Sequence, residues 1–144
     1  MPVSRDQIVA VARSWIGTPF HHQARVKGVG ADCVGLTIGV ALELGLIDAR
    51  TAKSLPADYK PHPDPALMRR VLGEHMDSVW PAQVGDWVWM AAINQQPVHV
   101  CLLSGPDTII HAHHGSGGVV EHSFRGLART AKGAFSYRGI VDDG

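Results

Sequence analysis

The chain has 144 residues, of which 45% are apolar and 18% are charged, and its formal net charge is zero. This length suits one domain with a substantial core, so we expect a single domain over residues 1–144. The composition excludes a disordered tail or a fibrous repeat. A balanced charge argues against nucleic acid as a partner, because phosphate groups require a basic face. No apolar run approaches the length of a transmembrane helix, so no membrane insertion is expected.

The first fifteen residues do not form a secretory signal, because Arg5 and Asp6 are followed by only a short apolar run, Ile8–Ala12, which Arg13 ends. We therefore expect synthesis in the cytoplasm without an export signal. Two cysteines, Cys33 and Cys101, are too few for a disulfide framework, and such a domain more often keeps its thiols free. Free thiols and nine histidines are unusual in so short a chain, and their positions in the predicted elements indicate whether they have a function.

Helical patterns fill the first half of the chain. Ser4 and Gln7 form a capping-box pattern before an apolar stripe at helical spacing. The pattern predicts, in chain order, a helix from Ser4 to Trp15, a loop over 20–31, a helix from Cys33 to a left-handed Gly45, an irregular excursion over 46–64 and a helix from Asp64 to Gly73.

After Trp80-Pro81 the pattern changes to short strands separated by turn residues. The expected strands are Trp87–Ala91, Val98–Leu103, Thr108–Ala112, Val119–His122 and Phe135–Val141. Helices followed by consecutive short strands indicate an α+β fold with an antiparallel sheet.

Cys33 stands where a glycine-containing loop meets the start of a helix. Unpaired amide groups and the helix dipole at such a position favour a thiolate, and can lower a cysteine pKa from about 8.5 to roughly 3.5–7.5. The sequence therefore predicts a nucleophile at Cys33. The alternative is a buried cysteine that acts as a small apolar side chain.

Two histidines fall on neighbouring strands that the turn over 104–107 joins into a hairpin. Strand alternation places His99 on the face away from the core, and in the next strand His111 shares a face with Ile109. If Leu103 pairs with Asp107, His99 stands directly opposite His111, close enough for the two imidazoles to interact. A cysteine nucleophile needs a base and an orienting partner for that base, and these histidines can supply both.

Zinc binding is the competing interpretation, because Cys33, His99 and His111 are residue types that ligate zinc. The sequence contains no C-x-x-C, no H-E-x-x-H and no closely spaced fourth ligand. We therefore predict no metal and no cofactor. Cys101 shares the alternation of His99 and is interpreted as a packing residue.

Five short motifs follow one another between residues 5 and 140. They are Trp15-Ile16-Gly17-Thr18-Pro19-Phe20, Gly30-Ala31-Asp32-Cys33-Val34-Gly35-Leu36, Val84-Gly85-Asp86-Trp87-Val88-Trp89, His99-Val100 and Ile110-His111-Ala112. Each motif is weak alone, but the ordered set resembles the NlpC/P60 cysteine peptidases. The stretch 22–30 is most similar to the branch of that family found in tailed phages and phage-like gene transfer agents.

The resemblance implies a papain-like α+β fold in which N-terminal helices pack on a central antiparallel sheet. It also implies hydrolysis of peptidoglycan stem peptides at the bond between γ-D-glutamate and the diamino acid. On this sequence, Cys33 would attack the carbonyl, His99 would act as general base and then as acid, and His111 would orient His99. The substrate-binding candidates are Asp32, Phe20 and His22.

The phage-like branch implies that the protein is carried on a particle tail, docks onto a tail-tip or baseplate protein and acts on the target cell wall. One alternative is a catalytically inactive structural tail component. Phe20 and Val34 leave room for it, since many family members have tyrosine and serine there. The other alternative is a thiol amidase or acyltransferase that uses the same triad on a different carbonyl.

Overall fold

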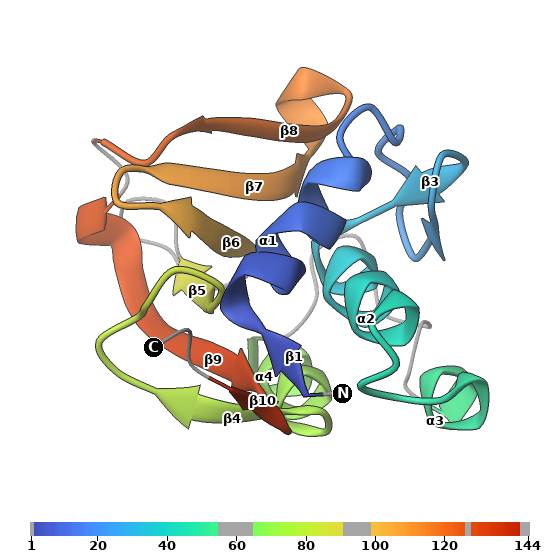
Figure 1. Cartoon of the computed structure of the whole chain (residues 1–144). Coiled ribbons are helices and arrows are strands. Elements are labelled where there is room, and N and C mark those ends of the chain that lie inside the picture. The colour runs from blue at the N-terminus through green and yellow to red at the C-terminus, as the bar shows by residue number, and fades with distance from the viewer. Residues whose placement is uncertain (1, 55–64, 91–98, 126–127, 142–144) are drawn as a thin grey trace.

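A computed structural model describes residues 2–54, 65–90, 99–125 and 128–141 (Figure 1). Its centre is a six-stranded sheet in the order β4-β9-β5-β6-β7-β8, in which every neighbouring pair is antiparallel. The strands of this sheet are β4 (Met76–Val79), β5 (Trp87–Met90), β6 (His99–Gly105), β7 (Thr108–His113), β8 (Gly118–Ser123) and β9 (Ala131–Tyr137). The expected α+β class with an antiparallel sheet is confirmed.

Four α-helices lie in the described part of the chain: α1 (Arg5–Ser14), α2 (Cys33–Glu43), α3 (Ala49–Ser54) and α4 (Pro65–Gly73). The short strands β1 (Val3–Ser4) and β10 (Ile140–Val141) pair in parallel, and β2 (Arg25–Val26) pairs with β3 (Gly30–Ala31). Two 3-10 turns, η1 (His114–Ser116) and η2 (Ala128–Thr130), complete the elements. Among the described residues, no helix combines the length and apolar character that a membrane span needs.

The start of α1 is the capping box that the sequence predicts. The Ser4 hydroxyl accepts a hydrogen bond from the Gln7 N–H at 3.2 Å, and the Gln7 side chain accepts one from the Ser4 N–H at 2.8 Å. These two bonds satisfy amide groups that a helix start leaves unpaired. After the helix, Gly17 takes a left-handed φ of 93° and turns the chain toward β8.

Helix α2 begins at Cys33 because Asp32 caps it. The Asp32 carboxylate accepts a hydrogen bond from the Gly35 N–H at 2.7 Å. Gly35 also permits a close approach of the preceding loop, since a Cβ at this position would lie 1.9 Å from the carbonyl oxygen of Ala24. The loop and the cap together fix where Cys33 lies at the helix start.

The core lies mainly on one face of the sheet. Helices α1 and α2 pack on this face (Figure 1), where their buried side chains meet those of β5, β6 and β7. The main cluster includes Ile8, Ala12, Leu36, Ile38, Val40, Trp87, Val100, Leu102, Ile110 and Ala112. A smaller apolar cluster of Val88, Met90, Cys101 and Ile109 covers the other face.

Several regions differ from the expectations. The excursion expected over 46–64 contains α3, whose N-cap Asp48 accepts a hydrogen bond from the Thr51 N–H at 2.7 Å. The loop expected over 20–31 contains the two-residue strands β2 and β3, which are too short to show a period. The strand β4 is not among the expected strands. Of the expected elements, residues 55–64, Ala91 and Val98 lie outside the described residues.

The predicted pairing of Leu103 with Asp107 is wrong by two residues. Leu103 lies opposite Ile109, because a bulge between Leu103 and Gly105 takes up extra chain at the turn. His99 is therefore not directly opposite His111. A shift of two residues keeps each side chain on its face, so both histidines still share one side of the sheet.

Candidate active site

Cys33 is the first residue of α2, and its half-buried thiol lies against the backbone of β6. Burial, with a smaller effect of the negative charge of Asp32, raises the pKa of this thiol to about 12. Hydrogen bonds from the N–H groups of Val100, Val34 and Cys33 itself act in the opposite direction. Val100 directly follows His99, so α2 carries the nucleophile candidate to the strand that bears the base candidate.

The expectation of a lowered Cys33 pKa is therefore wrong. Desolvation and the adjacent Asp32 carboxylate outweigh the helix-start amides, so the resting thiol keeps its proton. A catalytic step at this residue needs a base that removes the proton as the sulfur attacks.

We expect Cys33 to react slowly with iodoacetamide at neutral pH. Because the thiolate is the reactive form, the rate should keep rising with pH through pH 10 instead of reaching a plateau near pH 7. Mass spectrometry of the alkylated protein between pH 6 and 10 measures this rate, with Cys33→Ala as the background for the buried Cys101. A rate that levels off near neutrality would show a preformed thiolate instead.

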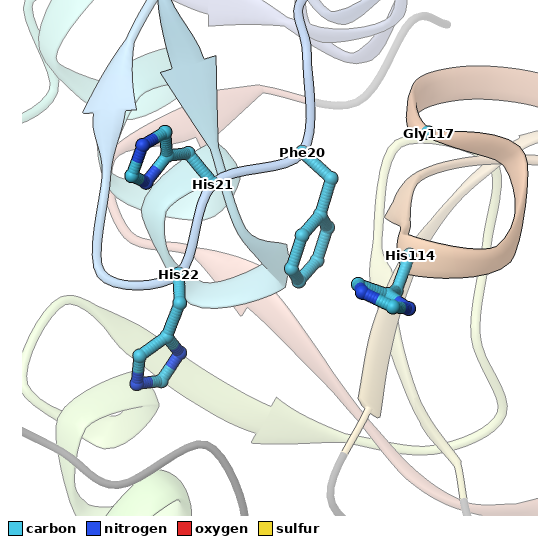
Figure 2. A pocket seen from close by; sticks show the side chains of 5 residues that line it. All are labelled: Phe20, His21, His22, His114 and Gly117. Atoms are coloured by element: carbon cyan, nitrogen blue, oxygen red, sulfur yellow. The ribbon is translucent and has the colours of Figure 1, made fainter.

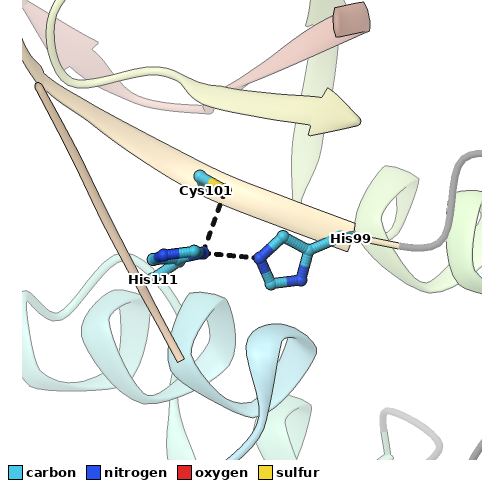
Figure 3. Close-up of side chains that lie close together, drawn as sticks. All are labelled: His99, Cys101 and His111. Carbon is cyan, nitrogen blue, oxygen red and sulfur yellow. Dashed lines mark hydrogen bonds between the residues drawn. The ribbon is translucent and has the colours of Figure 1, made fainter. Parts of the chain in front are cut away.

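His99 and His111 contact each other on the sheet face opposite the main core (Figure 3). Nε2 of His99 lies 2.6 Å from Nδ1 of His111, and the rings are inclined at 64°. The contact is diagonal, since neighbouring strands allow large side chains offset by two residues to meet. The structure thus brings the base and orienting candidates together, by a different register from the one expected.

Two further side chains join His111. Nε2 of His111 lies 2.5 Å from Nε2 of His122 on β8, and Nδ1 of His111 lies 3.4 Å from Sγ of Cys101 on β6. No role was predicted for His122, although pairing of β7 with β8 and strand alternation place it on the face of His111. Cys101, interpreted as packing, is buried but also contacts this histidine.

Burial keeps both candidate histidines uncharged. Burial, with a smaller effect of the neighbouring imidazoles, lowers the pKa of His99 to about 4 and that of His111 to about 3. A neutral imidazole has one lone pair available to take a proton. Since Nε2 of His99 is engaged by His111, the ring nitrogen left for proton exchange is Nδ1.

The three histidines form a chain whose polarity matters. If His99 donates its Nε2–H to Nδ1 of His111, then His111 carries its hydrogen on Nε2 and donates it to His122. This arrangement leaves Nδ1 of His99 with a lone pair. The opposite polarity would place a hydrogen on Nδ1 of His99, which could then no longer accept a proton. By accepting the hydrogen bond from His111, His122 favours the polarity in which His99 can act as a base.

Two substrate-binding candidates line one cavity. Phe20 and His22 enclose about 400 Å³ together with His21, His114 and Gly117 (Figure 2). The Phe20 ring meets that of His114 edge to face at 5.1 Å. The segment is held by Phe20, whose backbone N–H donates to the carbonyl oxygen of Gly117 at 2.8 Å. The cavity offers an apolar wall with imidazole nitrogens around it.

Asp32, the third substrate-binding candidate, is buried and holds local structure. Its carboxylate accepts hydrogen bonds from the N–H groups of Gly35 and Gln23, each at 2.7 Å. One carboxylate oxygen also lies 3.9 Å from Nδ1 of His22. Asp32 therefore links the cavity segment to the helix that starts at Cys33.

Comparison with solved structures identifies the class of fold as NlpC/P60. The chain is similar to the NlpC/P60 domain of the peptidoglycan hydrolase SagA, with 25% identity and a TM-score of 0.63 over 93% of this chain and 99% of that domain. It is also similar to an NlpC/P60 family protein from Bacillus cereus ATCC 10987 (19% identity, TM-score 0.67) and to NlpC2 from Trichomonas vaginalis (16% identity, TM-score 0.65).

The alignments with the last two structures cover 98% and 92% of this chain but only 42% and 46% of theirs, so the chain spans less than half of each. No protein-family model matches the sequence, and no curated protein is significantly similar to it. The papain-like NlpC/P60 fold expected from the five motifs is thus confirmed from structural likeness.

Proposed function

We propose that this protein is a cysteine endopeptidase that hydrolyses peptidoglycan stem peptides at the bond between γ-D-glutamate and the diamino acid. The observation that carries the proposal is the hydrogen bond of His111 to His99, which begins the strand that Cys33 contacts. The likeness to a domain of a peptidoglycan hydrolase supports the cell wall as the substrate. The bond itself is proposed from the motif resemblance.

In the proposed mechanism, Sγ of Cys33 attacks the carbonyl carbon while Nδ1 of His99 takes the thiol proton. The carbonyl oxygen becomes negatively charged, and the N–H of Cys33 at the helix start, which contacts the thiol in the resting state, then donates to this oxygen. The imidazolium form of His99 donates Nε2–H to His111, then returns its Nδ1 proton to the leaving amine. Water, activated by His99, hydrolyses the thioester and restores the thiol.

We assign the cavity beside Phe20 and His22 to the stem peptide. Phe20 bridges in parallel to Ala31, two residues before Cys33, so the cavity segment is tied to the strand that leads to the nucleophile. An apolar ring and nearby imidazoles suit a short peptide with carboxylate groups. Asp32 positions this segment through Gln23 and contributes a negative charge that acts on the Cys33 thiol.

Carriage on a phage-like particle is a separate part of the proposal. It rests on the resemblance of residues 22–30 to the branch found in tailed phages and gene transfer agents. A tail-tip or baseplate protein would then be the docking partner, and the target cell wall the place of action.

The experiment is a digest of purified peptidoglycan under reducing conditions, with the products identified by mass spectrometry. The unmodified protein should release fragments that end in D-glutamate, and Cys33→Ala should release none. Fragments cut at another amide, absent with Cys33→Ala, would favour the amidase alternative. An intact wall with both proteins would favour the inactive structural component.

A further inference from the structure

Cys101 has no part in the proposed hydrolysis, yet its buried thiol lies beside both histidines (Figure 3). The ligand atoms of His99, Cys101 and His111 all lie within 4.8 Å of one another. Two of these separations are short, at 2.6 Å between the imidazole nitrogens and 3.4 Å from Sγ of Cys101 to Nδ1 of His111. Three potential metal ligands therefore converge on one point of the sheet.

We propose that His99, Cys101 and His111 form a binding site for a Zn²⁺ ion. Two imidazoles and a thiolate are ligands that zinc binds in a tetrahedral arrangement, at about 2.0–2.1 Å from nitrogen and about 2.3 Å from sulfur. Those bond lengths require the two nitrogens to lie about 3.3 Å apart and nitrogen and sulfur about 3.6 Å apart. Cys101 is thus already at a suitable distance from His111, and the two rings need to separate by less than an ångström. The ligand atoms of His99 and Cys101, which lie within 4.8 Å of each other, must also come to about 3.6 Å.

The surroundings of His111 suit a zinc ligand. A metal-bound imidazole is oriented by the hydrogen bond that its other nitrogen donates. Nε2 of His111 lies 2.5 Å from Nε2 of His122, so a hydrogen on Nε2 can be donated there while Nδ1 faces the metal. His99 would bind through Nε2 and carry its hydrogen on Nδ1. The fourth position of the ion is left for water.

Binding of zinc at this site has a defined proton balance. The Cys101 thiol loses its proton to the solvent as the Zn–S bond forms, because a metal-bound thiol is deprotonated. The Zn–N bond to His99 displaces the hydrogen from Nε2 of that ring, and a hydrogen is taken up on Nδ1 of the same ring by exchange with solvent, so His99 stays neutral. His111 binds through the lone pair of Nδ1 and keeps its hydrogen on Nε2. Neither an oxidant nor a reductant is required.

The site would switch the enzyme off, a consequence that rests on the proposed function. With zinc on Nε2, His99 carries a hydrogen on Nδ1 and has no lone pair to take the proton of Cys33. Zinc should therefore inhibit hydrolysis reversibly, and a chelator should restore it. Metal binding itself depends only on the three side chains, so it is measured independently of any hydrolysis.

The test is titration of the full chain with ZnCl₂ by calorimetry and with CoCl₂ by absorption, in the reduced protein and in Cys33→Ala and Cys101→Ala. The unmodified protein and Cys33→Ala should each bind one ion and show a thiolate-to-cobalt charge-transfer band. Cys101→Ala should lose the band. Loss of a residue that only hydrogen-bonds a metal ligand weakens metal binding by about 10- to 100-fold, so loss of the ligand Cys101 should weaken zinc binding at least as much.

Two outcomes would overturn the site. Absence of 1:1 zinc binding in the unmodified protein would do so. A charge-transfer band that survives in Cys101→Ala but disappears in Cys33→Ala would place the ion on the nucleophile instead. Inactivity toward peptidoglycan with intact metal binding would overturn the proposed function and leave the zinc site standing.

Discussion

Replacement of His99 with alanine is expected to reduce kcat on peptidoglycan by about 10²- to 10⁴-fold, the range for loss of a general base. Because the Cys33 pKa is about 12, almost no thiolate exists at neutral pH to bypass the missing base. The effects of substitutions at residues that act in one catalytic step are not additive. The variant with both Cys33→Ala and His99→Ala should therefore have a kcat no lower than that of Cys33→Ala alone. Release of soluble stem peptides over time measures all three variants.

The pH profile of His99→Ala distinguishes a lost base from a disturbed fold. Its residual rate should rise about tenfold per pH unit above pH 7, as the thiolate fraction of Cys33 increases. The unmodified enzyme should not show this slope. A flat residual rate in His99→Ala, with the fold intact by circular dichroism, would remove His99 from the role of base.

Variants of the histidine chain should lower kcat and leave KM unchanged, because His111 and His122 act through His99 and not on the substrate. His111→Ala should lose more than His122→Ala, since His111 contacts the base directly. The matched control is His113→Ala, whose ring stacks on His111 at 4.9 Å but hydrogen-bonds Ser116 at 2.7 Å. The control should lose far less activity than His111→Ala.

Local sequence rules predicted the features that depend on a few neighbouring residues. The capping box at Ser4, the helix start at Cys33 and the left-handed Gly45, with φ of 72°, all arise from backbone chemistry within one turn. The same is true of strand alternation, which placed His99 and His111 on one face. The predicted contact between them is present although the predicted strand register is wrong, because an error of two residues leaves each side chain on the same face of the sheet.

Features set by contacts between distant segments could not be predicted in this way. The pKa of Cys33 depends on how completely β6 and the loop before α2 enclose the thiol, and that enclosure outweighs the helix start. The bulge after Leu103 and the meeting of His111 with His122 and Cys101 depend on how three strands align. Helix α3 is different, since its cap at Asp48 was a readable local signal.

Acidification below pH 6.5 is expected to destabilise the fold steeply, because buried histidines resist protonation. His75 is 5% exposed, and its Nε2 lies 3.4 Å from the Thr37 hydroxyl. Burial, with a smaller effect of the positive charges of Arg138 and Arg25, lowers its pKa to about 4. His111 is 2% exposed, and burial lowers its pKa to about 3.

The sign follows from proton counts. Histidines in the unfolded chain titrate near pH 6.5. Below that pH they bind protons in the unfolded chain, whereas the buried histidines of the folded chain stay neutral. The contribution of these histidines to the free energy of unfolding is thus completely present above pH 6.5 and is lost as the pH drops toward 4. Each buried histidine contributes a slope of about 1.4 kcal/mol per pH unit, and His75 with His111 contributes about 3 kcal/mol per pH unit. Domains of this size have a free energy of unfolding of about 5–15 kcal/mol. The loss of stability should therefore be large enough to unfold a marginally stable domain near pH 5.

Urea unfolding at pH 7.5, 6.5, 5.5 and 5.0 measures this dependence. His75→Gln places a neutral amide beside Thr37 and removes one titrating group, so its slope below pH 6.5 should be smaller by about 1.4 kcal/mol per pH unit. Above pH 7, where histidines are neutral in both states, the histidine contribution to the slope should vanish in both proteins. Equal slopes below pH 6.5 in the two proteins would mean that His75 takes up its proton in the folded state, and that the packing around Thr37 and Tyr137 admits the charge.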